Sequence, residues 1–190
     1  MSSTNDKIIA RAIAAVLGGT PTVSVHADAG ETSKLAVMVC EDAPSRNLYS
    51  FSTVGLSDTP IAGRVLPQPP LGSEILAVSN EEDFALVVST AGFCVVNSGW
   101  VAEPGLLFPD LVGMHFEDTT VPHLLFVTPY LWDPAPPTLT LEAKTVAWAM
   151  GVPVSDAERA YRREHGWEAL EALFEERDPD FIDLERDCVA

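Results

Sequence analysis

The sequence predicts an α+β fold, a single domain of residues 1–190 in which helices pack a mixed, largely antiparallel sheet. Short apolar or alternating runs at residues 34–41 and 48–54 have the length and the Val or aromatic content of strands. Residues 138–152 alternate polar and apolar side chains around a polar break at 142–144, which predicts a hairpin. The chain has 190 residues, of which 47% are hydrophobic, and this is enough for one sizeable core.

The N-terminal segment predicts an amphipathic helix over residues 5–17, ended by a pair of glycines. Its apolar positions share one face, namely Ile9, Ala12, Ile13, Val16 and Leu17. Asp6 and Arg11 interrupt the apolar pattern and the apolar part is short, so a helix explains the segment better than a signal peptide.

Turn signals dominate the next part of the chain, after a weaker strand pattern at residues 22–26. Residues 55–60, GLSDTP, predict a turn that fixes the exit of the preceding strand. Ser57 and Asp58 lie in this turn, and the sequence nominates no base that would activate the serine. The prolines at 67, 69 and 70 predict an exposed loop.

A central helix is expected after a strand at residues 74–78. Ser79 and Glu82 have the spacing of a capping box, which places the helix start at Ser79. Leu86 and Phe93 make the second side of this helix apolar, so we expect it to be deeply buried. Gly92 predicts a close approach of a neighbouring element. The inward face comprises Phe84, Val87, Val88, Ala91 and Val95.

The second half predicts strands at residues 113–116 and 123–128, after an irregular stretch from 100 to 109. The hairpin strand is expected to end at Pro153 or to lie at an edge there, because proline cannot donate to a ladder. Ser155 and Glu158 form a second capping box, and Gly166 supplies the stop of that helix. A last helix follows over residues 167–176. The acidic tail, residues 178–190, is expected to be partly mobile.

The net charge of −17 is the strongest compositional signal. It argues against partners that carry phosphate, both nucleic acid and anionic membrane surfaces, because these require Lys and Arg. It permits electrostatic attraction of a basic protein partner, although solubility is the better explanation of an acidic surface. No apolar run is long enough to span a bilayer, so residence in the cytoplasm is expected.

The sequence assigns no catalytic, cofactor-binding or metal-binding residue. Only one cluster resembles a metal site, comprising His115, Glu117, Asp118 and His123, and unrelated strand and surface positions explain it better. P-loop, G-x-S-x-G and G-x-G-x-x-G motifs are missing from the sequence. The three cysteines lack the spacing of a disulfide framework or a zinc site, so no cofactor is expected.

The C-terminal segment is the preferred candidate for contact with a partner. Glu168, Glu171 and Glu175 fall on one side of the last helix at three- and four-residue spacing, and Glu176 and Asp178 extend the charge. A solvated face is the simpler explanation of the same pattern. Among the tryptophans, Trp148 and Trp167 are expected in the core. Trp100 and Trp132, beside Gly and Pro, are expected to be partly exposed and able to anchor a partner.

A family resemblance rests on three stretches of the chain. Residues 144–166, KTVAWAMGVPVSDAERAYRREHG, resemble the closing segment of the suppressor of fused-like domain family. Residues 55–60 and residues 123–132, HLLFVTPYLW, are similar to earlier landmarks of that family. The resemblance covers residues 47–176 and points to the single-domain bacterial type. These are packing and turn motifs, so they identify a fold better than an activity.

The resemblance implies a protein-binding function, and for bacterial members the role of an immunity protein that neutralises a toxin domain. It implies no enzyme. The expected partner is a protein, and a basic toxin domain would fit the charge; the oligomeric state stays open. The alternative is a small enzyme or ligand-binding protein whose site is built from dispersed residues. A deep polar pocket with converging histidines and carboxylates would favour that alternative.

Overall fold

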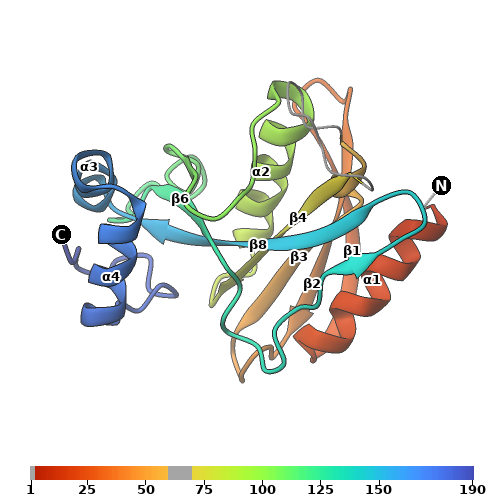
Figure 1. Ribbon diagram of the computed structural model, residues 1–190, viewed down its shortest axis with the longest axis horizontal. Helices are drawn as coiled ribbons and strands as arrows, with labels where there is room; N and C mark the ends of the chain where they lie inside the picture. Colours follow the sequence, from red (N-terminus) through yellow and green to blue (C-terminus); the bar gives the residue numbers. More distant parts are fainter. Residues whose placement is uncertain (1–2, 60–69) are drawn as a thin grey trace.

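The computed structural model describes residues 3–59 and 70–190, and its centre is one eight-stranded sheet (Figure 1). The strand order is β1-β2-β3-β4-β8-β6-β5, with β7 paired to β8 beside this path. Neighbouring strands are antiparallel except β4 and β8. The predicted α+β class and the largely antiparallel sheet are therefore confirmed. The strands are β1 Thr20–Ala27, β2 Lys34–Glu41, β3 Tyr49–Val54, β4 Leu71–Ser79, β5 Leu107–Phe108, β6 His123–Val127, β7 Leu139–Thr140 and β8 Thr145–Val154.

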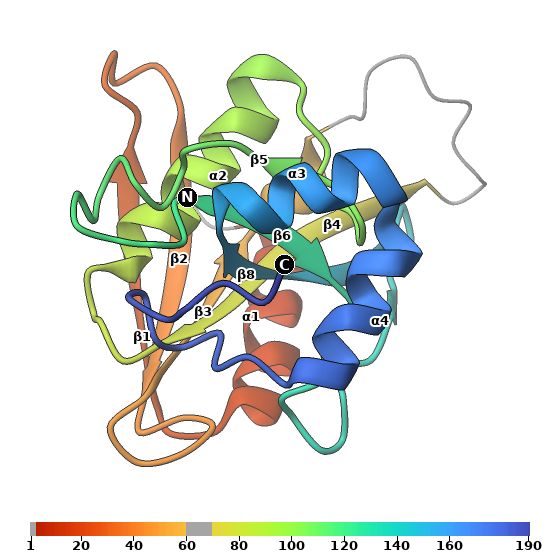
Figure 2. The ribbon, with the colours of Figure 1, turned by 90° about the vertical axis from the view of Figure 1, so that its left-hand side faces the viewer.

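Helices cover both faces of the sheet (Figures 1 and 2). The sheet therefore separates the core into two clusters, one on each face. Along β2 the side chains alternate between the faces, as a pleated strand requires. Met38 and Cys40 belong to the cluster of α1, Thr4–Leu17, whereas Leu35 and Val37 belong to that of α2, Phe84–Ser98. The first cluster also receives the apolar face of the C-terminal helix α4, Trp167–Arg177.

Helix α1 confirms the amphipathic helix that the N-terminal sequence predicts. The Ser3 hydroxyl accepts the backbone N–H of Asp6 at 3.0 Å, and the Asp6 carboxylate accepts the backbone N–H of Ser3 at 2.6 Å. This reciprocal cap satisfies donors that the first turn leaves free. Ile9 and Ile13 are fully buried beneath the helix.

Helix α2 begins later than the sequence predicts. Ser79 remains in β4, where it pairs with Tyr49 of β3, and its hydroxyl accepts the backbone N–H of Glu81 at 3.0 Å in a turn. The helix starts at Phe84, because continued strand pairing competes successfully with the local cap signal. Leu86 is 42% exposed, so the expectation that both sides of the helix are buried is wrong.

The expected close approach at Gly92 is confirmed. A Cβ atom at this position would lie 2.1 Å from the Cδ2 of Leu35, which is closer than any real contact. A side chain at residue 92 would therefore force the Leu35 side chain to move, and glycine lets the helix sit directly on β2 with Leu35 in place.

Two predictions for residues 100–116 are wrong. Residues 113–115 form turns instead of a strand, and the stretch expected to be irregular contains the short strand β5. Strand β8 continues through Pro153 to Val154, and Pro153 lies at an edge of the sheet there, which is the second of the two outcomes expected for it. Its pairing with β4 stops at Met150, and the Pro153 carbonyl accepts a hydrogen bond from Arg186 rather than from β6. The backbone nitrogen of Pro153 therefore faces away from β6, so the absence of an N–H at this position breaks no strand pairing.

Helix α3, Asp156–His165, begins at the predicted capping box. The Ser155 hydroxyl accepts the Glu158 N–H at 3.2 Å, and the Glu158 carboxylate accepts the Ser155 N–H at 2.8 Å. Gly166, at φ 94°, ends this helix and lets α4 begin at once in a new direction.

Replacing Ser155 with Ala is expected to lower the free energy of unfolding by about 1 kcal/mol, because the backbone donor of Glu158 loses its partner. Chemical denaturation measures the change. Ser155→Thr keeps the acceptor oxygen and serves as the matched control. Equal midpoints for the Ala variant and the parent would contradict the capping role.

The C-terminal tail, which the sequence predicts to be partly mobile, is docked on the rest of the fold. The Leu184 carbonyl accepts the Thr120 N–H at 3.1 Å and the Thr119 hydroxyl at 2.6 Å. Arg186 is buried behind these contacts.

The predicted loop at prolines 67 and 69 lies outside the described residues. Within residues 3–59 and 70–190, no helix has both the length and the apolar character required to cross a bilayer.

Candidate functional site

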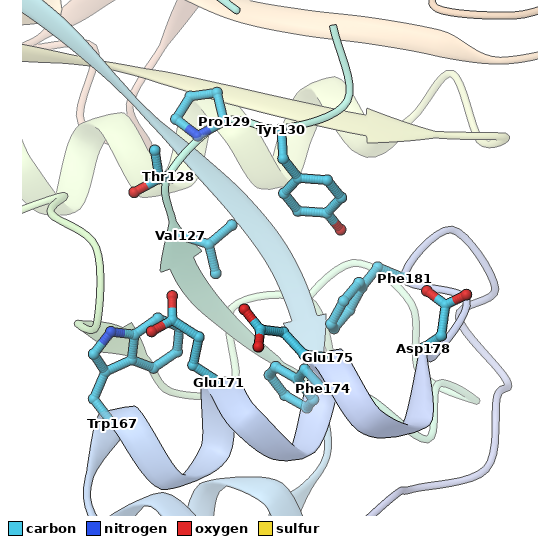
Figure 3. Close-up of a pocket in the computed structure, with 10 residues that line it drawn as sticks. All are labelled: Val127, Thr128, Pro129, Tyr130, Trp167, Glu171, Phe174, Glu175, Asp178 and Phe181. Atoms are coloured by element: carbon cyan, nitrogen blue, oxygen red, sulfur yellow. The ribbon is translucent and has the colours of Figure 1, made fainter.

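A groove of about 360 Å³ opens between helix α4 and the segment that follows β6 (Figure 3). Its floor and walls are aromatic and apolar, and carboxylates stand along one rim. Figure 3 shows Glu171 and Glu175 projecting from α4 into the opening, with Tyr130 on the opposite wall. The lining residues are Val127, Thr128, Pro129, Tyr130, Trp167, Glu171, Phe174, Glu175, Asp178 and Phe181.

The sequence positions these side chains by helix periodicity and by the end of one strand. Leu170 and Phe174 point into the core, which turns Glu171 and Glu175 toward the open side of α4. The ring of Phe174 packs edge-on against Phe181 at 5.0 Å between centroids, and this contact holds the residues after α4 against the helix.

The groove carries excess negative charge that the described chain does not neutralise. Arg177 pairs with Glu176 on the exposed side of the helix, and Arg186 is buried in a separate pair. Glu171, Glu175 and Asp178 have no ion pair with a basic side chain of the described residues. Partial burial, together with the charges of Asp178 and Asp180, raises the pKa of Tyr130 to about 12. The phenol is thus neutral at physiological pH.

The structure brings together three of the five acids that the sequence nominates. Glu171, Glu175 and Asp178 line the groove, whereas Glu168 and Glu176 are exposed outside it. Helix spacing identified these acids in the sequence. The aromatic wall, including Tyr130, comes from a distant strand end that no local pattern connects to α4.

The exposure of the four tryptophans differs in part from what the sequence predicts. Trp100 is 39% exposed, as expected, and lies by β5 with its ring 4.7 Å from that of Phe108. Trp132 is only 6% exposed and packs in the core, so the expectation that it is accessible to a partner is wrong. Trp148 is buried as expected, and Trp167 is half-buried at the groove.

Glu158 has a second role beside its part in the capping box, and the sequence did not predict this role. Its fully buried carboxylate receives both terminal nitrogens of Arg186, at 2.7 and 2.8 Å. It also accepts the backbone N–H of Val189 at 3.2 Å. Burial alone would raise the pKa of Glu158, but the hydrogen bonds from Arg186 and Ser155 outweigh it and lower this pKa. The pair fastens the tail behind α3.

A second buried carboxylate, Glu74 of β4, organises the turn that the sequence predicts at residues 55–60. One carboxylate oxygen accepts the N–H groups of Gly55 and Ser57, both at 3.0 Å, and the Ser57 hydroxyl at 2.7 Å. The other accepts the Leu56 N–H at 3.2 Å and the Thr53 hydroxyl at 2.6 Å. Burial raises the pKa of Glu74, and these donors oppose the shift.

The same network gives Ser57 a lysine partner that the sequence did not nominate. The Lys144 ammonium lies 2.6 Å from the Ser57 hydroxyl and 2.6 Å from a carboxylate oxygen of Asp58. The serine donates to Glu74 and accepts from Lys144, so both of its hydrogen-bonding roles serve the turn. Ser57 is 7% exposed, which leaves little access for a substrate. The arrangement supports the interpretation of this turn as structural.

The four residues of the possible metal cluster do not converge. His115 is hydrogen-bonded to Thr90, whereas buried His123 accepts the Asp110 N–H through Nδ1 and lies 3.0 Å from Asp156 through Nε2. Within the described part of the chain, no group of three or more His, Cys, Asp or Glu side chains could hold a metal ion.

Comparison with protein families identifies the class to which this fold belongs. The model of the suppressor of fused protein (SUFU) family matches residues 31–187, and the chain therefore belongs to this family. The family resemblance seen over residues 47–176 is thus confirmed and extended toward both ends.

A relative of known name and two solved structures accompany this match. The chain is 33% identical over 186 residues to the immunity protein YqcF of Bacillus subtilis strain 168, covering 97% of this chain and 96% of that protein. The crystal structure of a SUFU homologue from Neisseria gonorrhoeae FA 1090 superposes with a TM-score of 0.71 at 15% identity, covering 98% and 97% of the two chains. A chain of the Sufu–Fu complex gives 0.64 at 13% identity, covering 97% and 92%. These two structures establish the shared fold.

Proposed function

We propose that this protein is an immunity protein that binds a toxin domain in the cytoplasm and neutralises it. The observation that carries the proposal is its 33% identity to an immunity protein along almost the whole of both chains. The Sufu–Fu complex adds a case in which a protein of this fold is found with another protein. The protein acts by occupying a surface of its partner and needs no catalytic group.

The acidic groove on α4 is the proposed contact surface. Its aromatic walls can pack the aliphatic stem or the guanidinium plane of a basic side chain, while the rim carboxylates receive its charge. Trp167 and Phe174 supply apolar surface beside Glu171 and Glu175. Burying these carboxylates against Arg or Lys would also relieve their mutual repulsion at four-residue spacing. A basic patch on the toxin domain is therefore the expected counterpart.

Removing the groove charge is expected to slow association with the toxin domain about tenfold at low ionic strength, because opposite charges steer the encounter. The variant combines Glu171→Gln, Glu175→Gln and Asp178→Asn. Asn tolerates the left-handed conformation that residue 178 adopts, at φ 46°. Surface plasmon resonance at two salt concentrations measures the association rate, and added salt should reduce the difference from the parent.

The matched control removes the same charge elsewhere, by Gln at the exposed residues Glu31, Glu41 and Glu142. We expect this variant to associate at nearly the parental rate. If both triple variants slow association equally, overall charge and not the groove attracts the partner. If neither does, the acids of α4 form a solvated face.

Neutralisation itself requires a growth assay. The tagged protein is used to isolate its partner from native cells, and the partner's toxin domain is then expressed alone or with this chain. The proposal expects growth arrest in the first case and growth in the second. Persistent arrest despite a stable complex would refute neutralisation, and a partner that is harmless when expressed alone would refute the immunity role.

A further inference from the structure

Strand β1 forms an unprotected edge of the sheet, at the end opposite α4 (Figures 1 and 2). It has eight residues and pairs, within the described chain, only with β2. No other described part of the chain covers either face of β1, and Val23 and Val25 are 54% and 69% exposed. Natural proteins protect such edges by charged side chains, by proline or by shortness, and β1 has one proline, Pro21, near its start. The opposite edge strand, β5, has two residues, whereas β1, with the sequence TPTVSVHA, carries no Lys, Arg, Asp or Glu.

The register shows which backbone groups of β1 are free. The Asp28 N–H donates to the Ser33 carbonyl at 3.1 Å, directly beyond the last ladder pair, Ala27 with Lys34. Hydrogen-bonded pairs alternate along an antiparallel ladder, so the even-numbered residues of β1 bond to β2. The odd-numbered residues consequently direct their N–H and C=O groups away from the sheet, and the side chains of Val23 and Val25 share one face.

We infer that a second copy of this chain pairs with β1, in an antiparallel arrangement that joins two sheets into one. When Ser24 lies on the twofold axis, Val23 of each copy faces Val25 of the other, and both N–H and both C=O groups of each pair find partners. The Ala27 N–H then reaches the Pro21 carbonyl of the second copy. Proline falls at an outward position, where its missing N–H takes nothing from β2. Apart from the Ala27 carbonyl, which meets the nitrogen of Pro21 and gains no donor, the outward groups of β1 are therefore complementary to themselves.

Strand β1 itself carries no acidic side chain, so the net charge of −17 on each copy does not act from the paired strand. A basic partner has no carboxylate to meet along the strand, and two copies bring no like charges directly opposite one another there. The acidic grooves lie at the other end of each sheet (Figure 1). At about 4.8 Å per strand, the four spacings from β1 to β8 in each copy already exceed the Debye length of about 8 Å at physiological salt. Both grooves stay open to toxin in the dimer. Paired strands bury less area than a standard stable interface of roughly 1,200–2,000 Å², so the dimer should dissociate on dilution.

Sedimentation of the purified full chain over a range of concentrations tests the inference without any toxin. The parent should shift from the monomer mass toward the dimer mass as its concentration rises. Val25→Pro removes an outward N–H but no bond to β2, and it should abolish this shift. Val25→Thr keeps the N–H and the strand preference, and it should retain the shift. If the proline variant is misfolded by circular dichroism, Val25→Lys replaces it.

Cross-linking tests the register, in a Cys188→Ser background that removes the exposed native thiol. Two Ser24 residues at the axis form a non-hydrogen-bonded pair with Cα atoms about 4.5 Å apart, which a disulfide can bridge. Ser24→Cys should therefore form a covalent dimer on mild oxidation. The matched control is Thr22→Cys, whose copies would lie about 13 Å apart along the strands and should not cross-link.

A parent that stays monomeric at all concentrations overturns the inference, as does a dimer that survives Val25→Pro or cross-links through residue 22 instead of 24. If the chain is monomeric and Val25→Pro weakens binding of the isolated toxin partner, β1 receives a strand of that partner and the dimer is refuted. A dimer as described supports the inference whether or not the immunity function holds, because mass and cross-linking are read without the toxin.

Discussion

Replacing Glu74 with Gln is expected to lower the free energy of unfolding by about 3 kcal/mol, because buried backbone donors lose their acceptor. An amide keeps one acceptor oxygen but turns an NH₂ group toward donors that the carboxylate accepted. The N–H groups of Gly55, Leu56 and Ser57 all point at this carboxylate, and Glu74 is fully buried. Such a loss is a large part of the 5–15 kcal/mol typical of a folded domain.

Chemical denaturation of Glu74→Gln measures this loss, with Glu82→Gln as a control at an exposed position. Lys144→Met provides a second comparison in the same network. Asp58, its ion-pair partner, is 54% exposed and can be solvated by water, so we expect a smaller loss than for Glu74→Gln. If Lys144→Met destabilises the protein more than Glu74→Gln, the lysine and not the carboxylate organises the turn.

Replacing Arg186 with Ala is expected to cost about 3–5 kcal/mol, since it leaves the buried carboxylate of Glu158 without its counter-ion. The side chains of the pair are 5% and 0% exposed. The tail beyond residue 183 should also become accessible to proteases, because the docking contacts of Val189 depend on the same carboxylate. Limited proteolysis and denaturation measure the two effects.

Arg177→Ala is the matched control, because Arg177 pairs with Glu176 at the exposed surface, 3.5 Å away. Surface pairs of this kind contribute roughly 0–1 kcal/mol. The double variant Glu158→Gln with Arg186→Met removes both charges and should cost less than the sum of the single changes. Equal losses for Arg186→Ala and Arg177→Ala would contradict the role of the buried pair.

The lowered pKa of Glu158 also makes a pH prediction for the same pair. A carboxyl group whose pKa is lower in the folded state contributes its full stability above its unfolded value, 4.5, and loses it as the pH falls through the folded value. The parent should therefore lose stability below about pH 4.5 more steeply than Glu158→Gln. If the melting temperatures of the two proteins fall equally with pH across this range, the pKa of Glu158 is not lowered in the folded state.

Local signals in the sequence were sufficient for much of the fold. Alternation and composition identified β2, β3, β6 and β8, and the Ser155 capping box placed the start of α3 correctly. The helical spacing of Glu171 and Glu175 identified the exposed side of α4. These features depend on neighbours within a few residues, which the sequence displays directly.

Only the tertiary structure decided which charges are buried and what faces them. Glu158 meets Arg186 across 28 residues, and Lys144 reaches Asp58 across 86, so no local pattern separates these groups from solvated acids and bases. The same reason explains why Trp132 was expected at the surface. Ser79 pairs with Tyr49, a residue 30 positions earlier in the chain, and this strand pairing outweighed the capping signal that predicted a helix start at Ser79. The sequence alone determined the local conformation and the acidic side of α4. Folding determined which side chains the buried charges contact, because the free energy of such a contact depends on the burial that folding creates.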